Sequence, residues 1–282
     1  MLVGFLVVLA AVLGGYALSG GPFAVLFQPN ELLVIGGAAL GALIVSAPGA
    51  VGKRVIHALK HGAKSKPPGR KEYLDLLGLL YSLFQKMRRD GVLTMEEHIT
   101  EPAKSPIFMK YPSVLARPHA VAFLAEGMKQ LVDGCSPDDL LMLCDADLET
   151  QEAAEHEPIG LIRTTGDALP GLGIVAAVLG IVITMGHLDA GPEEIGHHVA
   201  AALVGTFLGI LLCYGFVGPL ATRLEHQGAA ELRYLACIKS GLLAASRGSN
   251  PQLSIEFARR AVFPDERPTS PELDKAIAQA KG

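Results

Sequence analysis

The sequence has no tryptophan, few charged residues, and four long stretches with no charged residue at all. Charged residues make up 18% of the 282 positions, against 50% that are hydrophobic. Asp, Glu, Lys and Arg are all missing from residues 1–20, 32–51, 169–188 and 199–220. Each stretch is close to the roughly 20 apolar residues that a helix needs to cross a ~30 Å hydrocarbon layer. This distribution argues against a soluble enzyme and predicts four transmembrane helices.

Basic residues are missing from the two short connections between these stretches, 22–31 and 189–198. All 24 Lys and Arg lie in two longer segments, with 15 from Lys53 to Arg163 and 9 from Arg223 to Lys281. Basic residues next to membrane helices are retained in the cytoplasm. We therefore expect a multi-pass protein of the bacterial inner membrane with both termini cytoplasmic. No basic residue precedes the first stretch, which disfavours a cleavable signal peptide there.

The predicted fold is an all-α membrane protein with four transmembrane helices and a large helical cytoplasmic domain. A transmembrane hairpin is expected over residues 1–51, a cytoplasmic helical domain over 52–168, a second transmembrane hairpin over 169–220 and a cytoplasmic C-terminal helical segment over 221–282. No stretch alternates apolar and polar residues as a half-buried strand would.

Three local patterns add detail to the segment 52–168. Residues 53–71 are basic and contain two adjacent prolines, so they are expected to form an irregular linker beside the lipid head groups. Gly91 follows a helical pattern and is expected to end that helix. Residues 94–97 (Thr-Met-Glu-Glu) match a capping box and predict the start of a short helix.

The sequence also lacks the motifs of catalytic and cofactor sites. It contains no Gly-rich phosphate loop, nucleophile elbow or zinc-protease motif. Its four cysteines show no Cys-x-x-Cys spacing, and His187, His197 and His198 lack the pattern of a structural metal site. The net charge of −4 comes from mixed-sign segments and gives no reason to expect a nucleic-acid partner. We therefore expect a protein that is not an enzyme and needs neither cofactor nor metal.

Small residues line the third and fourth stretches. In the fourth they recur every four positions, at Ala201, Gly205, Gly209 and Cys213. The third contains Gly173, Ala176, Ala177 and Gly180. Such stripes let helix backbones approach closely in lipid, where apolar burial gives no drive to associate. Packing of the two helices on each other explains one stripe, and two stripes predict contacts with further helices, hence an oligomer.

No carboxylate occurs within the four stretches, although ion carriers place ionisable groups inside the membrane. The polar groups there include the hydroxyls of Thr184, Thr206 and Tyr214. These alone cannot pass an ion across ~30 Å of hydrocarbon. Either the protein moves no ions, or a partner supplies the acid. Pro170 and Pro219 mark the inner ends of the last two stretches, and ordinary packing accounts for each from the sequence alone.

With these residues in view, the chain closely resembles the MotA family, the A subunit of the bacterial flagellar motor stator, whose superfamily includes TolQ and ExbB. The most specific matches are residues 166–180 (GDALPGLGIVAAVLG) and 204–221 (VGTFLGILLCYGFVGPLA). Shorter matches lie at 14–16 (GGY), 27–29 (FQP) and 266–268 (ERP). TolQ and ExbB proteins have three spans, so the four predicted here favour MotA.

The resemblance implies a partner and an assembly. A homo-oligomer, a pentamer, of A subunits would surround the single spans of B-type, MotB-like subunits, whose intramembrane Asp carries the ion. Thr206 and Tyr214 match positions that face the B-type spans. Pro170 and Pro219 match the prolines that couple ion passage to cytoplasmic movement.

Torque and ion choice also follow from the resemblance. Arg88 and Glu96 match the charges that meet a protein of the rotor switch complex, with Arg89 as an alternative to Arg88. Ala177 stands where sodium-driven members carry Thr, and a methyl group cannot ligate a hard cation, which favours protons. The expected function is therefore coupling of proton flow to torque. A TolQ- or ExbB-like energiser of a periplasmic partner and a non-conducting membrane scaffold are the alternatives.

Overall fold

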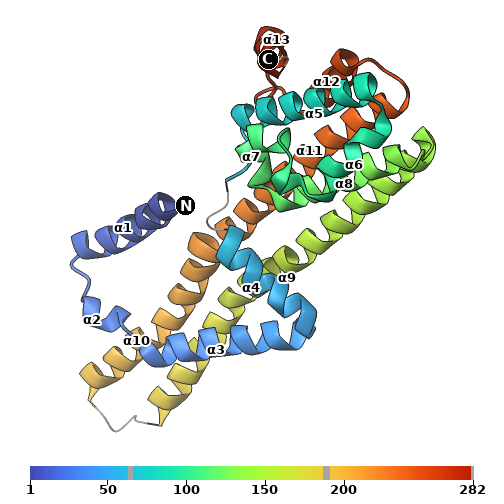
Figure 1. Cartoon of the computed structure of the whole chain (residues 1–282). Helices are drawn as coiled ribbons and strands as arrows, with labels where there is room; N and C mark the ends of the chain where they lie inside the picture. The colour runs from blue at the N-terminus through green and yellow to red at the C-terminus, as the bar shows by residue number, and fades with distance from the viewer. Residues whose placement is uncertain (63–65, 187–190, 281–282) are drawn as a thin grey trace. The chain divides into compact units, whose positions relative to one another are not determined.

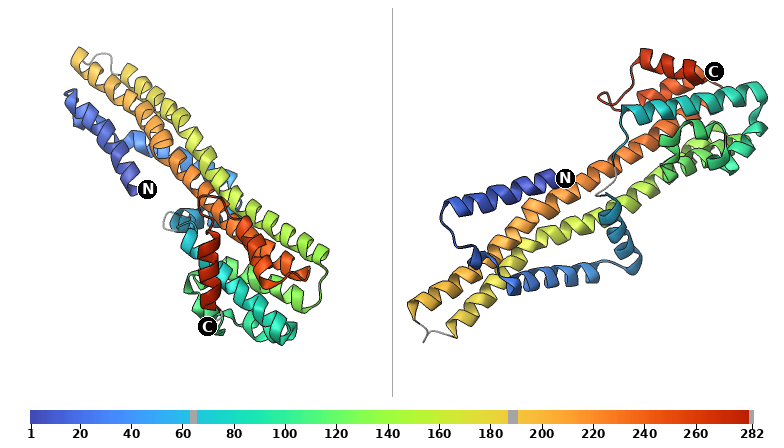
Figure 2. Two further views of the ribbon diagram at one scale, coloured as in Figure 1. Left: turned by 90° about the horizontal axis from the view of Figure 1, so that it is seen from above. Right: turned by 60° about the vertical axis from the view of Figure 1, so that its left-hand side comes forward.

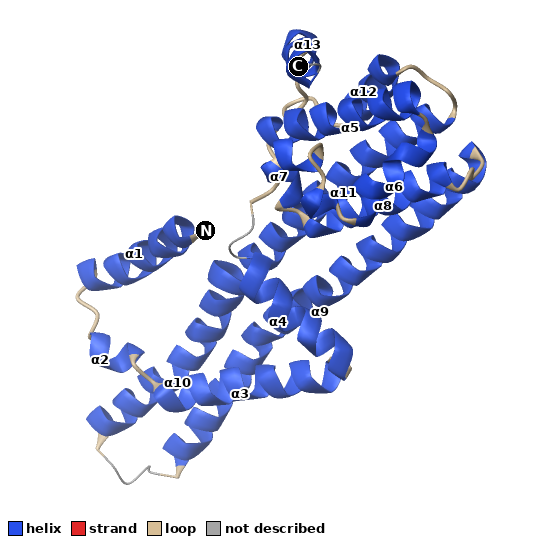
Figure 3. Cartoon of the chain, viewed as in Figure 1, coloured by secondary structure: helices blue, strands red, loops and turns tan. Residues whose placement is uncertain are grey.

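The computed structural model describes residues 1–62, 66–186 and 191–280, and these contain helices and no strand (Figure 3). The chain divides into two compact units. The first unit comprises Met1–Ser65 and Glu155–His226, and the second comprises Lys66–Ala154 and Gln227–Gly282. Two long helices contribute to both units, α9 (Pro137–Met185) and α11 (Gly218–Ser246) (Figure 1). The all-helical prediction is confirmed for the described part of the chain.

The first unit contains the apolar helices. Its elements are α1 (Leu2–Leu18), α2 (Phe23–Leu26), α3 (Pro29–Ser46), α4 (Gly49–Gly62), the later part of α9, α10 (Pro192–Leu212), a π-helical turn (Cys213–Val217) and the start of α11. The end of α9 and α10 run side by side in all views, and α3 packs against both (Figures 1 and 2). Ile35 of α3, Ala176 of α9 and Cys213 are buried together at the centre of this packing.

Three helical stretches are long and apolar enough to cross a membrane: Phe23–Ser46, Pro137–Met185 and Pro192–Ser246. The helix α1 is apolar but has 17 residues, so it extends only about 26 Å along its axis. That length falls just short of a ~30 Å hydrocarbon layer. Three of the four predicted spans therefore have a helix of spanning length. The predicted end of the third span, residues 187 and 188, lies outside the described residues.

The predicted stretch 32–51 and the predicted irregular linker after it are both wrong in detail. Helix α3 starts three residues before that stretch and ends at Ser46, because Pro48 cannot continue it. A new helix, α4, follows at once, with the Val51 and Gly52 N–H groups donating to the Pro48 carbonyl. Val55 of α4 is buried against α9 and α11. The segment Gly49–Gly62 forms a helix because its apolar residues recur at helical spacing. The prediction of a linker gave weight to its basic residues and overlooked this spacing.

The second unit is built around α5 (Arg70–Asp90), which is buried along most of its length. Around it lie η1 (Val92–Met95), α6 (Glu96–Thr100), η2 (Pro102–Lys104), η3 (Phe108–Lys110), α7 (Pro112–Leu115), α8 (Pro118–Val132), the first part of α9, the rest of α11, α12 (Pro251–Arg260) and α13 (Ser270–Ala280). The rings of Tyr73 and Tyr234 pack 5.3 Å apart in its core. The apolar periodicity of α5 made this helix predictable.

The turn after α5 confirms the predicted helix end at Gly91 and contradicts the predicted capping box at residues 94–97. Gly91 ends α5 with a positive φ of 94°, a conformation that glycine adopts without strain. The predicted capping box is wrong, because the Thr94 hydroxyl donates to the Gly91 carbonyl at 2.7 Å instead of capping the next helix. Residues 92–95 form the 3₁₀ turn η1, and α6 then starts without a side-chain cap.

Candidate functional site

Helices α9 and α10 approach most closely through glycines. A methyl group at Gly173 would lie 2.6 Å from the Gly205 carbonyl oxygen, and one at Gly209 would lie 2.5 Å from the Leu169 carbonyl oxygen. Backbone atoms cannot move aside as a side chain can, so this interface admits only hydrogen at both positions. Gly173, Gly205 and Gly209, three of the residues predicted to pack the helices together, therefore lie at one contact.

The same interface continues about two turns further along α9, at Gly180. A methyl group at Gly180 would lie 2.7 Å from the Cβ atom of Ala202, which is 1% exposed. The sequence stripe had selected Ala201, which is only half-buried, so Ala202 is the residue in contact. The Thr184 hydroxyl donates to the Gly180 carbonyl at 2.8 Å and is thereby satisfied within its own helix.

One carboxylate enters this interface from α3. Glu31 places Oε2 2.6 Å from the position of a methyl group at Gly205, and Oε1 3.3 Å from that of one at Gly180. Its Oε2 atom is buried and has no hydrogen-bond partner among the residues that the structure describes. An unpartnered carboxylate oxygen inside a packed interface is costly. Such a group marks a functional site by default when it lies within a membrane-spanning segment.

Glu31 was not among the predicted site residues, because it lies one residue before the predicted span 32–51. The candidate span Phe23–Ser46 includes Glu31, which lies in the first turn of α3. The missed signal was the absence of side chains at Gly180 and Gly205, which leaves room for a carboxylate from a third helix.

The turns around the two prolines also meet. Pro170 lies in the interior of α9, where it removes one helical hydrogen bond. Four residues earlier, a methyl group at Gly166 would lie 2.7 Å from a Val217 methyl and 3.9 Å from the Gly218 nitrogen. Val217 ends the π-helical turn, two residues before Pro219.

The π-helical turn explains how the chain accommodates Pro219. Proline has no N–H, and its ring crowds the carbonyl four residues earlier, here that of Gly215. The Gly218 N–H instead bonds to the Cys213 carbonyl, one residue further back than in an α-helix. Such insertions occur frequently at functional sites. Two loosened turns on neighbouring helices thus lie in direct contact.

An ion pair joins α9 to α11 one to two turns beyond this contact. Arg163 Nε and Nη2 donate to the two carboxylate oxygens of Glu225 at 3.0 and 2.6 Å. Nη2 also lies 3.3 Å from the Thr222 hydroxyl. This bidentate geometry fixes the register of the two helices.

The three residues expected to face a partner, Ala177, Thr206 and Tyr214, do not all lie at the same interface. Ala177 and Thr206 lie beside the glycine contacts, since their backbones are within 3.3 Å of the methyl positions at Gly205 and Gly173 respectively. Tyr214 is 72% exposed on the surface of the single chain. The structure brings Ala177 and Thr206 to one interface and leaves Tyr214 on its outside.

The second unit carries the charges expected to meet the rotor. Arg89 donates to both oxygens of Asp90, at 2.7 and 3.0 Å, and Lys86 lies 3.3 Å from the same carboxylate. These partners, Arg89 first, lower the pKa of Asp90 to about 2. Arg88 is exposed on the last turn of α5. Of the two arginines, Arg89 is therefore engaged within its own turn.

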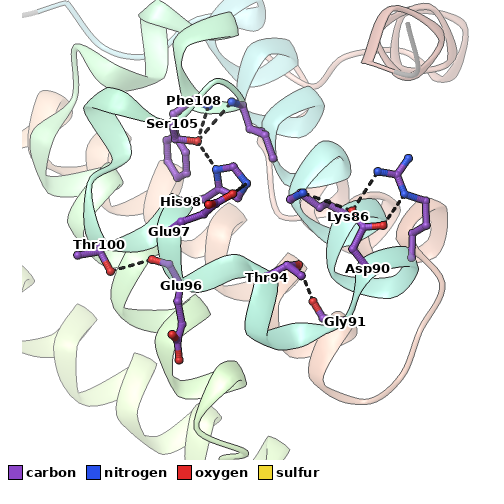
Figure 4. A network of polar contacts seen from close by, with 12 residues as sticks. Lys86, Asp90, Gly91, Thr94, Glu96, Glu97, His98, Thr100, Ser105 and Phe108 are labelled. Carbon is purple, nitrogen blue, oxygen red and sulfur yellow. Dashed lines mark hydrogen bonds and ion pairs between the residues drawn. The ribbon is translucent and has the colours of Figure 1, made fainter.

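Glu96 begins α6 beyond the Gly91 turn, and its side chain points away from the polar network shown in Figure 4. Its carbonyl accepts from the Thr100 hydroxyl at 2.7 Å. Glu96 and its neighbour Glu97 are both exposed, whereas the next residue, His98, is 3% exposed. The carboxylates of Glu96 and Glu97 therefore face solvent, whereas the side chain of His98 is buried and holds the segment in place.

The histidines near the second short connection do not form a metal site in the described part of the chain. His197 and His198 rings lie 6.3 Å apart, and His198 Nε2 is 4.0 Å from Glu194. No three His, Cys, Asp or Glu residues group closely enough to hold a metal ion within the described ranges. His187 lies outside those ranges.

Two family models match most of the chain. Residues 2–91 match the motility protein A N-terminal model, and residues 117–236 match the MotA/TolQ/ExbB proton channel family. Motility protein A of Escherichia coli (strain K12) is 38% identical over all of this chain and 96% of its own length. Chemotaxis protein LafT of Vibrio parahaemolyticus is 34% identical over 99% of this chain and 98% of its own.

Two solved structures share the fold. The C. jejuni MotAB structure aligns with a TM-score of 0.80 at 21% identity, covering 95% of this chain and 98% of its own. The flagellar MotAB stator complex from Bacillus subtilis aligns with a TM-score of 0.75 at 25% identity, covering 91% of this chain and 92% of its own.

Proposed function

The chain belongs to the motility protein A family and is a flagellar motor stator subunit, and we propose that it couples proton flow across the inner membrane to torque on the rotor. The coupling requires a B-type, MotB-like partner. The protein acts as a non-enzymatic channel component.

The placement of carboxylates carries this proposal. In α9 from Leu169 to Met185 and in α10 with its π-helical turn from Val199 to Val217 there is no Asp or Glu. Glu31 is the carboxylate that α3 inserts between them, at the level of Gly180 and Gly205. One acid at one level cannot pass a proton through ~30 Å of hydrocarbon. A partner span with its own Asp, packed beside Thr206 and Ala177, completes the path.

The topology that fits this role has four spans, with α1 as the first and both termini in the cytoplasm. The short length of α1 is accommodated by local thinning of the bilayer, which costs a fraction of a kcal/mol per Å of mismatch. The distribution of Lys and Arg supports this orientation. It places residues 52–168 and 221–282 inside, Glu31 near the periplasmic surface and the Gly166–Val217 contact near the cytoplasmic surface.

Assembly as a pentamer around the partner spans agrees with the apolar surface of the single chain. Ile174, Val178, Val182 and Leu203 are each more than half exposed on α9 and α10. Such side chains require lipid or further helices around them. Copies of this chain and the B-type spans share that surface.

Coupling runs through the two proline turns. When the partner's Asp takes up a proton, its contact with α9 and α10 changes, and the Gly166–Val217 contact is where the helices can bend. One charge crossing the membrane supplies about 2.3 kcal/mol per 100 mV, enough to bias such a step. Arg88 and Glu96 then transmit the movement to oppositely charged residues of the rotor. Ala177, which offers no oxygen ligand, favours protons over sodium.

Proton flux into vesicles tests this function. We expect flux, read by a pH-sensitive dye, when the chain is reconstituted with its B-type partner after removal of any plug segment of that partner. Neither protein alone should conduct. Flux from this chain alone, unchanged after Thr206→Ala, would contradict the requirement for a partner acid.

A TolQ- or ExbB-like energiser of a periplasmic partner would also conduct protons. The two functions differ in their cytoplasmic target. Swimming that depends on Arg88 and Glu96 identifies the stator. Flux that supports no swimming, but powers a periplasmic process, identifies the energiser.

A further inference from the structure

His98 is a buried histidine in the segment that carries Glu96. Its ring is 3% exposed, and its Nδ1 atom lies 2.8 Å from the hydroxyl oxygen of Ser105 (Figure 4). That hydroxyl oxygen also accepts from the backbone N–H groups of Ile107 and Phe108, at 3.3 and 3.4 Å. The two side chains thus join α6 to the turn that precedes η3.

The donors and acceptors in this network specify one protonation state of His98. Two N–H groups occupy the lone pairs of the Ser105 oxygen, so its own O–H must donate to Nδ1. Nδ1 is then an acceptor without a proton, and the proton of the neutral ring lies on Nε2. Nε2 lies 3.3 Å from Glu97 Oε1, but it is buried and has no hydrogen-bond partner among the described residues. The network therefore holds a neutral imidazole.

Protonation of His98 breaks this arrangement. A proton on Nδ1 makes it a donor, so Ser105 must turn its O–H away and give up an N–H partner. Burial is the main reason that the pKa of His98 lies below its ordinary value, with smaller opposing contributions from Glu97, which raises it, and Lys86 of α5, which lowers it. The other ionisable groups nearby are exposed: Glu101 and Lys104 of η2 pair with each other at 2.9 Å, and His119, Glu126 and Lys129 of α8 are solvent-exposed.

The segment has few other anchors. Helix α6 has five residues and starts without a side-chain cap, and η1 and η2 are single 3₁₀ turns. Helices this short are not stable by themselves, so packing and side-chain bonds hold them. Met95 and His98 are the two buried side chains between Val92 and Thr100, and they face the buried surface of α8.

We propose that neutral His98 is a positioning residue for Glu96, and that acidification of the cytoplasm releases the Glu96 segment and weakens its contact with the rotor. This rests on the proposed role of Glu96 and on the cytoplasmic location of the second unit. A histidine disfavoured in its charged form stabilises the fold fully above its ordinary pKa of about 6.5, and that contribution is lost as the pH falls toward its lower folded value. A motor that delivers protons to the cytoplasm would thereby reduce its own torque as protons accumulate.

The test compares the protein with His98→Asn and His98→Leu. The asparagine amide oxygen can accept from the Ser105 hydroxyl and does not titrate, whereas leucine fills the space but accepts nothing. His119→Asn, on the exposed surface of α8, is the matched control. Hydrogen–deuterium exchange of residues 92–108 is measured in the purified complex between pH 7.5 and 5.5, corrected for intrinsic exchange. Tethered-cell rotation is measured with cytoplasmic pH clamped over the same range.

In the unmodified protein and in His119→Asn, we expect exchange of residues 92–108 to rise about fivefold toward pH 5.5, the factor that corresponds to one net hydrogen bond. His98→Asn should show low exchange at every pH, and rotation that declines less with acid than in the unmodified protein. His98→Leu should show high exchange and slow rotation even at pH 7.5. Equal pH profiles for the unmodified protein and His98→Asn overturn the proposal. Absence of rotation at every pH, with a normal exchange profile, would instead refute the stator role.

Discussion

The close approach of α9 and α10 makes Gly173→Ala the sharpest perturbation of the first unit. The added methyl would lie 2.6 Å from the Gly205 carbonyl oxygen, 3.2 Å from the Gly209 Cα and 3.3 Å from the Thr206 Cα. Carbon atoms in favourable contact lie about 3.5–4.0 Å apart, so the helices must separate by roughly 0.5–1 Å. A gap of that size forfeits a quarter to a half of each contact energy across the interface.

The expected cost is about 1–3 kcal/mol, the range measured for overpacked cores. Gly171→Ala is the matched control, because a methyl group there meets no atom within 4 Å. Both substitutions bring the same gain in helix propensity, up to about 1 kcal/mol, so their difference isolates the packing. For a chain of this size, the difference corresponds to a melting temperature lower by about 2–4 °C per kcal/mol.

Thermal unfolding of the purified protein in detergent can be followed with a thiol-reactive dye. Cys144, Cys213 and Cys237 are buried and become reactive as the chain unfolds. Burial raises the pKa of the Cys144 thiol to about 11, which further suppresses its reaction in the folded state. A melting temperature for Gly173→Ala equal to or above that of Gly171→Ala would show that the helices do not pack as described.

Three further predictions concern charged groups. Glu31→Gln keeps the shape of the side chain but removes its acid, so vesicles containing the complex should lose proton flux while protein levels and stability are maintained; unchanged flux would exclude Glu31 from the path. Arg163→Glu alone places two carboxylates together and should lower the melting temperature by about 2–4 °C, and Glu225→Arg in the same chain should restore it; failure of the exchange to restore would mean that the pair does not set the helix register. The hydrogen bond from Arg259 is the main reason that the pKa of Glu256 is lowered to about 2, so this group stabilises the fold above its ordinary pKa of 4.5 and the contribution is lost as the pH falls from there. Melting curves from pH 6 to 3 should therefore show a weaker acid dependence in Glu256→Gln, and identical pH dependence would refute the assignment.

The helices of the second unit could be predicted because their signals are local. Apolar periodicity indicated α5, and Gly91 marked its end. The capping-box prediction failed because it rested on the local pattern alone. Residues 94–97 fit that pattern, but the Thr94 hydroxyl donates to the Gly91 carbonyl instead. A local pattern cannot decide whether a threonine hydroxyl accepts from an N–H of the following helix or donates to a preceding carbonyl.

The membrane site depended on contacts between distant segments. The stripes of small residues indicated that α9 and α10 approach closely, but they could not show that α3 inserts Glu31 into the space left by Gly180 and Gly205. Nor could the sequence show that the turn of Gly166 meets Val217, because that contact depends on the length of the π-helical turn. Register between helices is set by packing, which no single stretch encodes.

Rotation of tethered cells tests the central claim most directly. A strain without its own A subunit, supplied with this chain and its B-type partner, should rotate. The combined reversal Arg88→Glu and Glu96→Lys should stop rotation without lowering membrane levels, because like charges facing each other across an interface repel by several kcal/mol. Complementary reversals in the rotor protein should restore rotation in part. Normal rotation of the double reversal with an unmodified rotor would contradict the account.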